Sequence, residues 1–363
     1  MSFEEEVGML KLGVIGAGKY GAQLLRGFKQ AEYQGLAELV AVADIDEKRL
    51  QQAAREFGIR GYHDYREMLN KEELDGVGIA TPDHLHRDIA VYVARQGVHL
   101  FVEKPLDLTV KGCDEIITAA EKANVLLQVD FHKRFDPPHV VLKNEIQKGA
   151  LGDVLYGYMW MEDTIEVPTE WFPNWASSSS PAWFLGIHCY DLFRFLLGCN
   201  AVRVYATGHK NKLKAMGIDT YDSIQAKITF ENGATIVFDT SWVLPKHFVN
   251  IVNQGFRIVG TEGMWEVDGQ YRGITTCVTQ DGKTSTPNFY LYRETKDPHG
   301  KPFFSGYGID SMLNFVHNVK RLKTGASLAD LKGKYADGVD GKEATRIAVA
   351  VHESILTGEV IKL

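Results

Sequence analysis

Cysteines are few in this sequence, and long hydrophobic runs are absent. Four cysteines occur among 363 residues, at positions 113, 189, 199 and 277, and no two of them form a C-x-x-C pair. This low number favours a reducing cytoplasm without disulfide bonds, and no group of cysteines and histidines is spaced to complete a metal site. No stretch approaches roughly 18 uninterrupted apolar residues, so we expect no membrane-spanning helix. The acidic start, MSFEEE, does not resemble an export signal.

Basic charge is also in deficit. The chain has 40 Lys and Arg residues against 47 Asp and Glu residues, which gives a formal net charge of −7 at pH 7. Surfaces that bind nucleic acids or anionic membranes usually carry a basic excess, so we expect neither kind of partner. The hydrophobic fraction of 45% and the charged fraction of 24% are those of a globular protein, and the length suits two domains.

The first third of the chain alternates short apolar runs with amphipathic stretches. Strands are predicted at 11–15, 39–43, 77–80, 98–102 and 125–129, and helices at 20–31, 47–57, 87–96 and 110–123. Continuous apolar strands that alternate with helices indicate a parallel sheet covered on both faces, which is the doubly wound arrangement. We therefore predict an α/β domain over residues 1–130.

The pattern changes after residue 130. Strands are predicted at 154–160, 202–209, 223–230, 235–243, 250–259, 264–267 and 274–279, and helices at 139–148, 187–197, 310–323 and 341–356. Asn232-Gly233 predicts a hairpin turn, and Asp281-Gly282 predicts another. The second domain, residues 131–363, is thus expected to be α+β, with a large and mostly antiparallel or mixed sheet.

A glycine-rich motif, GAGKYG at residues 16–21, lies between the first predicted strand and the first predicted helix. This G-x-G-x-x-G pattern allows a tight turn, a close approach of a pyrophosphate to the backbone, and close packing of helix and strand. Asp44 ends the next strand, where a carboxylate can accept hydrogen bonds from ribose hydroxyls and would repel a 2′-phosphate. These features predict a Rossmann domain that prefers NAD to NADP; the alternative is a structural glycine turn beside an unrelated surface Asp44.

Polar residues also follow the third and fourth predicted strands. TPDHLH (81–86) comes directly after the third strand, and Glu103-Lys104-Pro105 comes directly after the fourth. Ligands of open α/β sheets bind beyond the carboxyl ends of the strands, so both segments should face the same crevice. Lys104 could donate a hydrogen bond to a substrate oxygen, or it could be a solvated lysine that closes a strand. Pro105 restricts Lys104 to extended geometry and permits a cis peptide bond.

The second domain contains further candidate residues. His188 and Asp191 are three positions apart on a predicted helix and so share one face; His188 could act as a general acid or base, or could be satisfied by local hydrogen bonds. Tryptophans and carboxylates interleave between residues 160 and 183, as a sugar or polyol site requires, although ordinary buried tryptophans would give the same pattern. The tryptophans are Trp160, Trp171, Trp175 and Trp183, and the carboxylates are Glu162, Asp163, Glu166 and Glu170.

Together these motifs resemble the glucose–fructose oxidoreductase, inositol dehydrogenase and rhizopine-catabolism (Gfo/Idh/MocA) family over nearly the whole chain. The glycine motif is generic, whereas the other pieces in this order are more specific. The matching pieces include GVIGAGKYG at 13–21, ATPDHLHRDIA at 80–90, VEKPL at 102–106, HKRFDP at 132–137, GIHCYDLFRFLLG at 186–198 and GTEG at 260–263.

The resemblance implies a Rossmann domain followed by a domain with an open-faced, largely antiparallel sheet, which often makes the contact of a homodimer or homotetramer. It implies that Lys104 lies at the substrate and that His188 is the catalytic histidine, moving the proton of the reacting oxygen. It further implies that Glu103 and His86 shape the nicotinamide site. The expected cofactor-binding residues are Gly16, Ala17, Gly18, Lys19, Tyr20, Gly21, Asp44, Thr81, Pro82, His86, Glu103 and Arg134.

One position departs from the family pattern. Many sugar and inositol members have an aspartate four residues before the histidine, where this chain has Phe184. Either Asp163 or Glu162 replaces the missing carboxylate, or Lys104 and His188 act alone on a substrate less like inositol. The residues expected at the substrate are Asp163, Trp175, Trp183, Phe184 and Asp191.

We therefore predict reversible hydride transfer between NAD and a secondary alcohol of a sugar, sugar derivative or cyclitol. The small polyhydroxy substrate is the expected partner, and no metal ion is expected. A non-catalytic sensor that binds a dinucleotide is the alternative from another class, favoured by Phe184 but opposed by the retention of both Lys104 and His188. The alternative among enzymes is a reductase of an unsaturated or imine substrate, or a dehydrogenase that opens glycoside metabolism by oxidising a ring hydroxyl.

Overall fold

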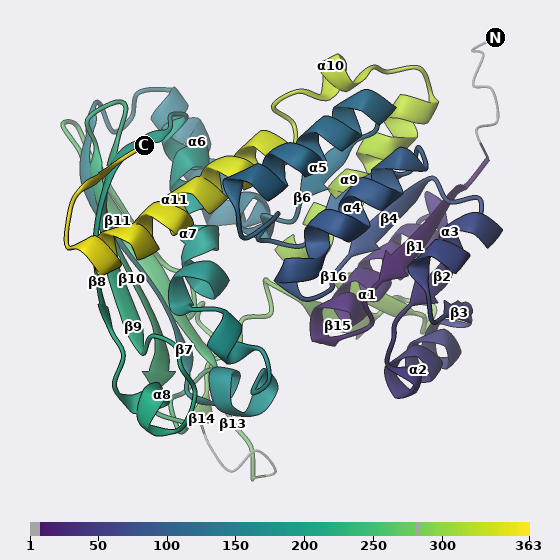
Figure 1. Cartoon of the computed structure of the whole chain (residues 1–363), viewed down its shortest axis with the longest axis horizontal. Helices are drawn as coiled ribbons and strands as arrows, with labels where there is room; N and C mark the ends of the chain where they lie inside the picture. The colour runs from purple at the N-terminus through teal and green to yellow at the C-terminus, as the bar shows by residue number, and fades with distance from the viewer. Residues whose placement is uncertain (1–7, 280–283) are drawn as a thin grey trace. The chain divides into compact units, whose positions relative to one another are not determined.

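The computed structural model describes residues 8–279 and 284–363 (Figure 1). The chain forms two compact units. The first comprises Met1–Phe135 and Tyr290–Lys342, and the second comprises Asp136–Phe289 and Glu343–Leu363. The predicted boundary after residue 130 differs from this division, because a segment from the last quarter of the chain belongs to the first unit.

A six-stranded parallel sheet forms the centre of the first unit. Its strand order is β3-β2-β1-β4-β5-β6, which is the order of the doubly wound dinucleotide-binding fold. Five of its strands follow the predicted apolar runs, and β3 was not predicted because it has three residues, two of them exposed. The strands are β1 (Leu10–Ile15), β2 (Ala37–Ala43), β3 (Arg60–Tyr62), β4 (Gly76–Ile79), β5 (His99–Val102) and β6 (Leu127–Val129).

The helices between these strands begin and end at recognisable signals. The side chain of Asp46 accepts a hydrogen bond from the N–H of Arg49 at the start of α2, and Gly58 ends that helix in the left-handed conformation. Thr109 caps α5 in the same way as Asp46 caps α2. The helices are α1 (Lys19–Tyr33), α2 (Glu47–Phe57), α3 (Tyr65–Lys71), α4 (His86–Arg95) and α5 (Val110–Ala123), of which α3 was not predicted.

The returning segment of the first unit, residues 290–342, packs into the same hydrophobic core as α1. It contains a hairpin, β15 (Arg293–Lys296) and β16 (Pro302–Ser305), followed by α9 (Tyr307–Lys323) and α10 (Leu328–Leu331). Phe315 of α9 is fully buried against Phe28 of α1 and Phe101 of β5, with ring centroids 6.1 and 5.5 Å apart. This burial of an apolar helix face is why the segment belongs to the first unit.

The second unit is built on a seven-stranded sheet with the order β12-β11-β7-β10-β9-β8-β17. All neighbouring strands are antiparallel except β7 and β10. Asn232 and Gly233 form the predicted turn between β9 and β10, with Gly233 at φ +86°. The strands are β7 (Val154–Thr164), β8 (Ala201–His209), β9 (Ser223–Phe230), β10 (Thr235–Leu244), β11 (Val252–Gly260), β12 (Met264–Asp268) and β17 (Ile361–Lys362).

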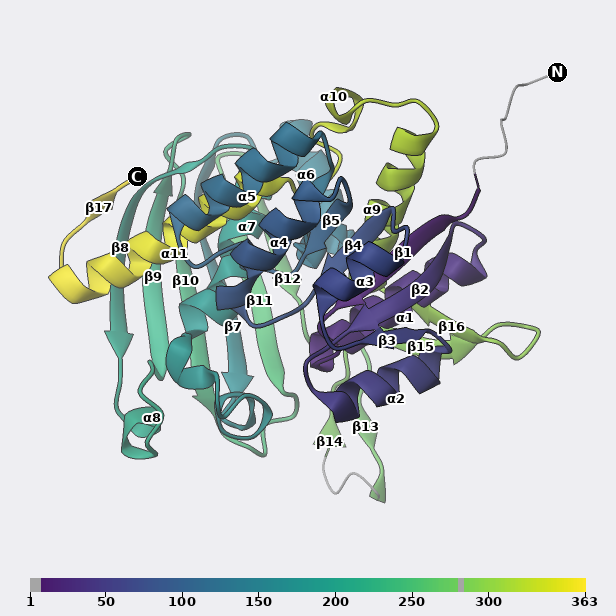
Figure 2. The same cartoon turned by 45° about the vertical axis from the view of Figure 1, so that its right-hand side comes forward.

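Among the described residues, helices cover one face of this sheet and leave the other open (Figures 1 and 2). Tyr190 and Phe193 of α7 (Ile187–Leu197) pack edge-on against Phe238 of β10, with ring centroids 5.3 Å apart in both pairs. The same face is covered by α6 (Pro137–Gln147) and by the part of α11 (Gly338–Thr357) that belongs to this unit. The opposite face carries exposed aromatic side chains, so the sheet is open-faced as expected.

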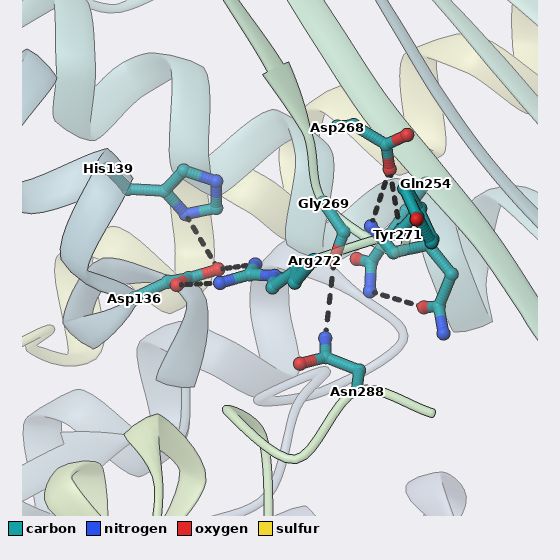
Figure 3. A network of polar contacts seen from close by, with 9 residues as sticks. Asp136, His139, Gln254, Asp268, Gly269, Tyr271, Arg272 and Asn288 are labelled. Atoms are coloured by element: carbon teal, nitrogen blue, oxygen red, sulfur yellow. Dashed lines mark hydrogen bonds and ion pairs between the residues drawn. The ribbon is translucent and has the colours of Figure 1, made fainter. Parts of the chain in front are cut away.

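A polar network links the segment that follows β12 to the start of α6 (Figure 3). Both carboxylate oxygens of Asp136 accept hydrogen bonds from the guanidinium of Arg272, and Asp136 is only 1% exposed. The Nε–H of Arg272 donates to the carbonyl oxygen of Gly269 at 3.1 Å, which also accepts from Asn288 at 3.2 Å. The predicted strand 274–279 is only β13 (Thr276–Cys277), paired with β14 (Thr284–Ser285), and the predicted Asp281-Gly282 turn lies outside the described residues.

Candidate active site

The glycine motif forms a tight turn between β1 and α1. Gly16 has a φ of +95°, and its N–H donates to the carbonyl oxygen of Ala43 at 2.8 Å. A Cβ on Gly16 would lie 2.4 Å from the carbonyl oxygen of Ala80, and a Cβ on Gly21 would lie 1.9 Å from the carbonyl oxygen of Gly16. A side chain at either position would displace the backbone, so the turn requires both glycines. The turn and the N-terminus of α1, residues 16–21, are called the cradle below. Backbone N–H groups in such a cradle fit the pyrophosphate of a dinucleotide.

Asp44 holds this turn in place. It follows β2 directly, and its carboxylate accepts hydrogen bonds from the N–H of Ala17 at 2.6 Å and the N–H of Asp46 at 2.8 Å. Lys19, which begins α1, is exposed. A carboxylate has about four lone-pair positions, so Asp44 can also accept hydrogen bonds from a ribose.

His86 fixes the two strand ends next to the glycine turn. Its Nε2 lies 2.9 Å from the carbonyl oxygen of Thr81, and its Nδ1 lies 2.8 Å from that of Pro105. Pro82 precedes the short turn that leads into α4. The peptide bond between Lys104 and Pro105 is cis, as the sequence allowed. His86 is fully buried and thus ties the segment after β4 to the segment after β5.

Lys104 is buried rather than solvated, with 7% of its surface exposed, so the simple strand-end alternative is wrong. Its Nζ lies 3.8 Å from Oε1 of Glu103. Burial raises the pKa of Glu103 well above its usual value, an effect that the charge of Lys104 opposes and that of Asp130 reinforces. Among the described residues, Oε2 of Glu103 and Oγ1 of Thr81 are buried without a hydrogen-bond partner. Such polar atoms at adjoining strand ends suit a nicotinamide ring with its carboxamide.

A partly buried polar network that the sequence did not reveal lies in the same unit. The hydroxyl of Tyr20 donates to Oδ2 of Asp130 and lies 3.3 Å from Nδ1 of His132, and the hydroxyl of Tyr292 donates to that of Tyr20 at 3.0 Å. Ser311 donates to Oδ1 of Asp130 at 2.7 Å. The detectable signal was a polar residue, Asp130, directly after the apolar strand β6, as at Asp44 and Glu103. The nearby Arg134 instead pairs with Asp340 at 3.0 Å.

The candidate residues of the second unit centre on α7. His188 lies in the first turn of α7 and Asp191 one turn later, and both are buried. Phe184, one turn before His188, belongs to an aromatic cluster with Phe172, Trp175 and Trp242. Its ring centroid lies 5.5 Å from that of Trp175 and 5.9 Å from that of Trp242. The position that carries a carboxylate in many relatives is therefore an apolar contact here.

The two carboxylates expected to substitute for that aspartate lie on opposite faces of β7. Asp163 alternates with the buried Met159 and Met161, on the face that α7 covers. Glu162 points the other way, and its Oε2 accepts a hydrogen bond from Asn253 at 2.9 Å. Only Asp163 therefore shares a face of the sheet with the helix of His188.

Trp183 lies against the part of α11 that belongs to its own unit. Its ring stacks on His352 with a centroid distance of 5.6 Å and an interplanar angle of 17°. Nε2 of His352 lies 2.8 Å from the hydroxyl of Ser180, and Nδ1 lies 2.7 Å from the carbonyl oxygen of Ala348. Ser179 and Ser180, at the end of a run of four serines, are both buried.

A glycine cradle at a helix N-terminus, an acidic residue after β2 and a buried lysine after β5 define an NAD-binding oxidoreductase. Matches to family models agree. Residues 10–131 match the model described as "Oxidoreductase family, NAD-binding Rossmann fold", and residues 139–266 match the GFO/IDH/MocA C-terminal domain. The chain belongs to the GFO/IDH/MocA oxidoreductase family, which confirms the resemblance seen in the sequence.

Relatives with known names show similarity over much or nearly all of the chain. A myo-inositol 2-dehydrogenase of Thermotoga maritima is 26% identical over 98% of both chains. A D-apiose dehydrogenase of Paraburkholderia graminis is 30% identical over 72% of this chain and 68% of its own length. The crystal structure of a scyllo-inositol dehydrogenase from Lactobacillus casei, with bound NAD(H) and scyllo-inositol, has a TM-score of 0.76, with 20% identity over 98% of this chain and 99% of that one. The last match shows a shared fold.

Across residues 8–279 and 284–363, none of the helices combines the length and the hydrophobicity that a membrane span requires. In the same ranges, histidine, cysteine, aspartate and glutamate side chains form no group of three or more that could hold a metal ion.

Proposed function

We propose that the protein oxidises a secondary alcohol on the ring of a cyclitol or a sugar, with NAD as the hydride acceptor, and that the reaction is reversible. The observation that carries this proposal is the buried pair Glu103 and Lys104 after β5, in the same unit as the glycine cradle. Oε2 of Glu103 and Oγ1 of Thr81 are buried there without a hydrogen-bond partner. The names of the relatives, which include inositol and apiose dehydrogenases, support a polyhydroxy substrate.

NAD supplies the hydride-accepting carbon when it is bound. The cradle at Gly16–Gly21 would hold its pyrophosphate, and Asp44 would accept hydrogen bonds from its ribose. Lys104 donates a hydrogen bond to the oxygen of the reacting alcohol and so stabilises the negative charge that develops there. His188 accepts the proton of that hydroxyl and later releases it to solvent. In the reverse direction, His188 returns the proton to the carbonyl oxygen.

Turnover and cofactor binding must be measured separately. Absorbance at the NADH band, recorded with NAD or NADP and a panel of inositols, aldoses and glycosides, should show NADH formation with one substrate class and little with NADP. Lys104→Met should lower kcat by about 10²–10³-fold, the usual cost of removing one donor that stabilises a developing negative charge. Its Kd for NAD should stay near the wild-type value, because the cradle is unchanged.

Lys111→Met is the matched control, since Lys111 lies in the same unit and its side chain is 89% exposed. This variant should turn over like the wild type. Wild-type turnover of Lys104→Met would rule out the role given to Lys104. Tight NAD binding without turnover across the panel would favour the non-catalytic sensor, the alternative that the apolar setting of Phe184 supports.

We also propose a homodimer or homotetramer formed through the open face of the second unit's sheet. Tyr156 and Tyr158 of β7 and Tyr205 of β8 are each more than two-fifths exposed on that face. Exposed aromatic side chains that gather on one sheet face mark an interaction surface. Sedimentation velocity of the purified protein should show a species larger than a monomer. The cytoplasmic location stays a prediction that rests on the low number of cysteines.

A further inference from the structure

Tyr20 occupies a variable position of the glycine motif, and its side chain leaves the motif for the interior of the first unit. It lies in the first turn of α1, whose N–H groups form the cradle. Its hydroxyl donates to Asp130 and accepts a hydrogen bond from Tyr292 at 3.0 Å. Burial and the neighbouring Asp130 raise the pKa of Tyr20 well above its usual value, so this hydroxyl remains a donor at neutral pH.

Asp130 connects that first turn to the strand end that carries Lys104. Its side chain is fully buried, and besides Tyr20 it accepts a hydrogen bond from Ser311 of α9 at 2.7 Å. Its backbone N–H donates to the carbonyl oxygen of Val102 at 2.8 Å. Val102 directly precedes Glu103 and Lys104 in the chain. One residue therefore bonds the glycine-motif helix with its carboxylate and the end of β5 with its backbone.

A buried carboxylate of this kind imposes strict geometry on its partners. Removing a charge from water is costly unless hydrogen-bond donors compensate it, and hydrogen bonds to ionised groups are short and directional. Tyr20 and Ser311 can donate to Asp130 only if α1 and α9 lie at the observed distance from β6. A shift of the first turn of α1 would therefore break the bond from Tyr20.

We propose that Tyr20 and Asp130 are positioning residues that hold the dinucleotide cradle at a fixed place relative to the strand end of Lys104. This inference rests on the proposed function, because it assigns the cradle to NAD and the strand end to the substrate oxygen. It concerns the side chain of Tyr20, whereas the motif concerns only the backbone at that position. Neither residue touches the reacting atoms in this scheme.

The test compares two substitutions of the same kind on the same helix. Tyr20→Phe removes the hydroxyl that binds Asp130, and Tyr33→Phe removes a hydroxyl from a side chain that is 42% exposed at the end of α1. The Kd of NAD is measured by calorimetric titration, well below the melting temperature of each variant. Tyr20→Phe should weaken NAD binding by about tenfold, the factor that corresponds to loss of one charge-assisted hydrogen bond. Tyr33→Phe should bind NAD like the wild type.

Kinetics separate positioning from general stability. Tyr20→Phe should raise the KM for NAD more than it lowers kcat at saturating NAD, because a bound cofactor restores the position of the first turn. A melting temperature that falls while the Kd of NAD stays within twofold of the wild type would overturn the proposal. Equal weakening in both tyrosine variants would overturn it too.

Asp130→Asn is measured instead if the Tyr20→Phe variant does not fold. This variant keeps the shape of the side chain and replaces a charge-assisted hydrogen bond with a neutral one, so the Kd of NAD should rise by about threefold. An unchanged Kd in this variant would overturn the proposal. All of these binding measurements need no alcohol substrate, so an absence of turnover with every polyol would count against the proposed function alone.

Discussion

The ion pair between Arg272 and Asp136 allows a quantitative test of what stabilises the second unit (Figure 3). Asp136 is 1% exposed and the side chain of Arg272 is 10% exposed, so this is a buried pair. Nη1 of Arg272 lies 2.8 Å from Oδ1 of Asp136, and Nη2 contacts Oδ2. Arg272→Met keeps much of the aliphatic volume but removes both of these bonds and the bond from Nε to Gly269.

The expected loss of stability in Arg272→Met follows from the charge of Asp136, which remains buried. Removing one partner of a buried pair costs about 3–5 kcal/mol, because the other charge stays buried without compensation. His139 is the nearby basic group, but its Nδ1 lies 4.0 Å from Oδ2 of Asp136, beyond hydrogen-bond distance. For a unit of this size a loss of 1 kcal/mol lowers Tm by about 2–4 °C. Arg272→Met should therefore lower the Tm of the second unit by about 6–20 °C.

Urea unfolding, followed by circular dichroism, measures the free energy directly. The matched control is Arg257→Met, which breaks the pair between Arg257 of β11 and Glu266 of β12, where both side chains are about half exposed. Solvent screens that pair, so its loss should cost less than about 1 kcal/mol. Asp136→Asn combined with Arg272→Met should recover part of the loss, since no buried charge then remains. Equal costs for Arg272→Met and Arg257→Met would refute the reasoning.

Two further outcomes are expected in the first unit. Gly21→Ala should abolish measurable NAD binding in a calorimetric titration, because its Cβ would lie 1.9 Å from the carbonyl oxygen of Gly16; wild-type affinity would contradict the cradle. Burial lowers the pKa of His99 from 6.5 to about 4, and its Nδ1 accepts a hydrogen bond from the N–H of Leu126. The unfolded chain then binds more protons between these pH values, so the free energy of unfolding should fall by up to about 3 kcal/mol as pH drops from 6.5 to 4. The free energy of unfolding of His99→Asn should fall less over this pH range. An equal fall in the wild type and the variant, measured by urea titration, would contradict this.

Local signals were sufficient to predict most elements of the parallel sheet and its helices. The helix at residues 47–57 has the predicted bounds because Asp46 and Gly58 are strong signals at its two ends. The helix at 310–323 was also predicted, but its assignment to the second domain differs from the observed units. Its apolar face packs on α1, and nothing in the local pattern states which sheet or helix an amphipathic helix will cover.

The candidate site was predictable where chemistry follows a strand directly, as at Asp44, Glu103 and Lys104. Tyr20 and Asp130 were not predicted as a pair, because 110 positions separate them and the hydrogen bond exists only once β6 lies in the sheet. The glycine motif does not specify the residues at its variable positions. The role of the Tyr20 side chain therefore cannot be predicted before the fold shows that Asp130 is its partner. The pair of Arg272 and Asp136, with a separation of 136 positions, was missed for the same reason.

Strand alternation resolves one choice that the sequence left between two carboxylates. Phe184 cannot assist His188 in proton transfer, because its phenyl ring packs among Trp175 and Trp242. Successive residues of β7 point to opposite faces, so Glu162 and Asp163 cannot both face α7. Glu162 bonds to Asn253 on the open face, whereas Asp163 is buried on the face that α7 covers. We therefore favour Asp163 over Glu162 as the carboxylate that replaces the missing aspartate, and the pleat of one strand is the reason.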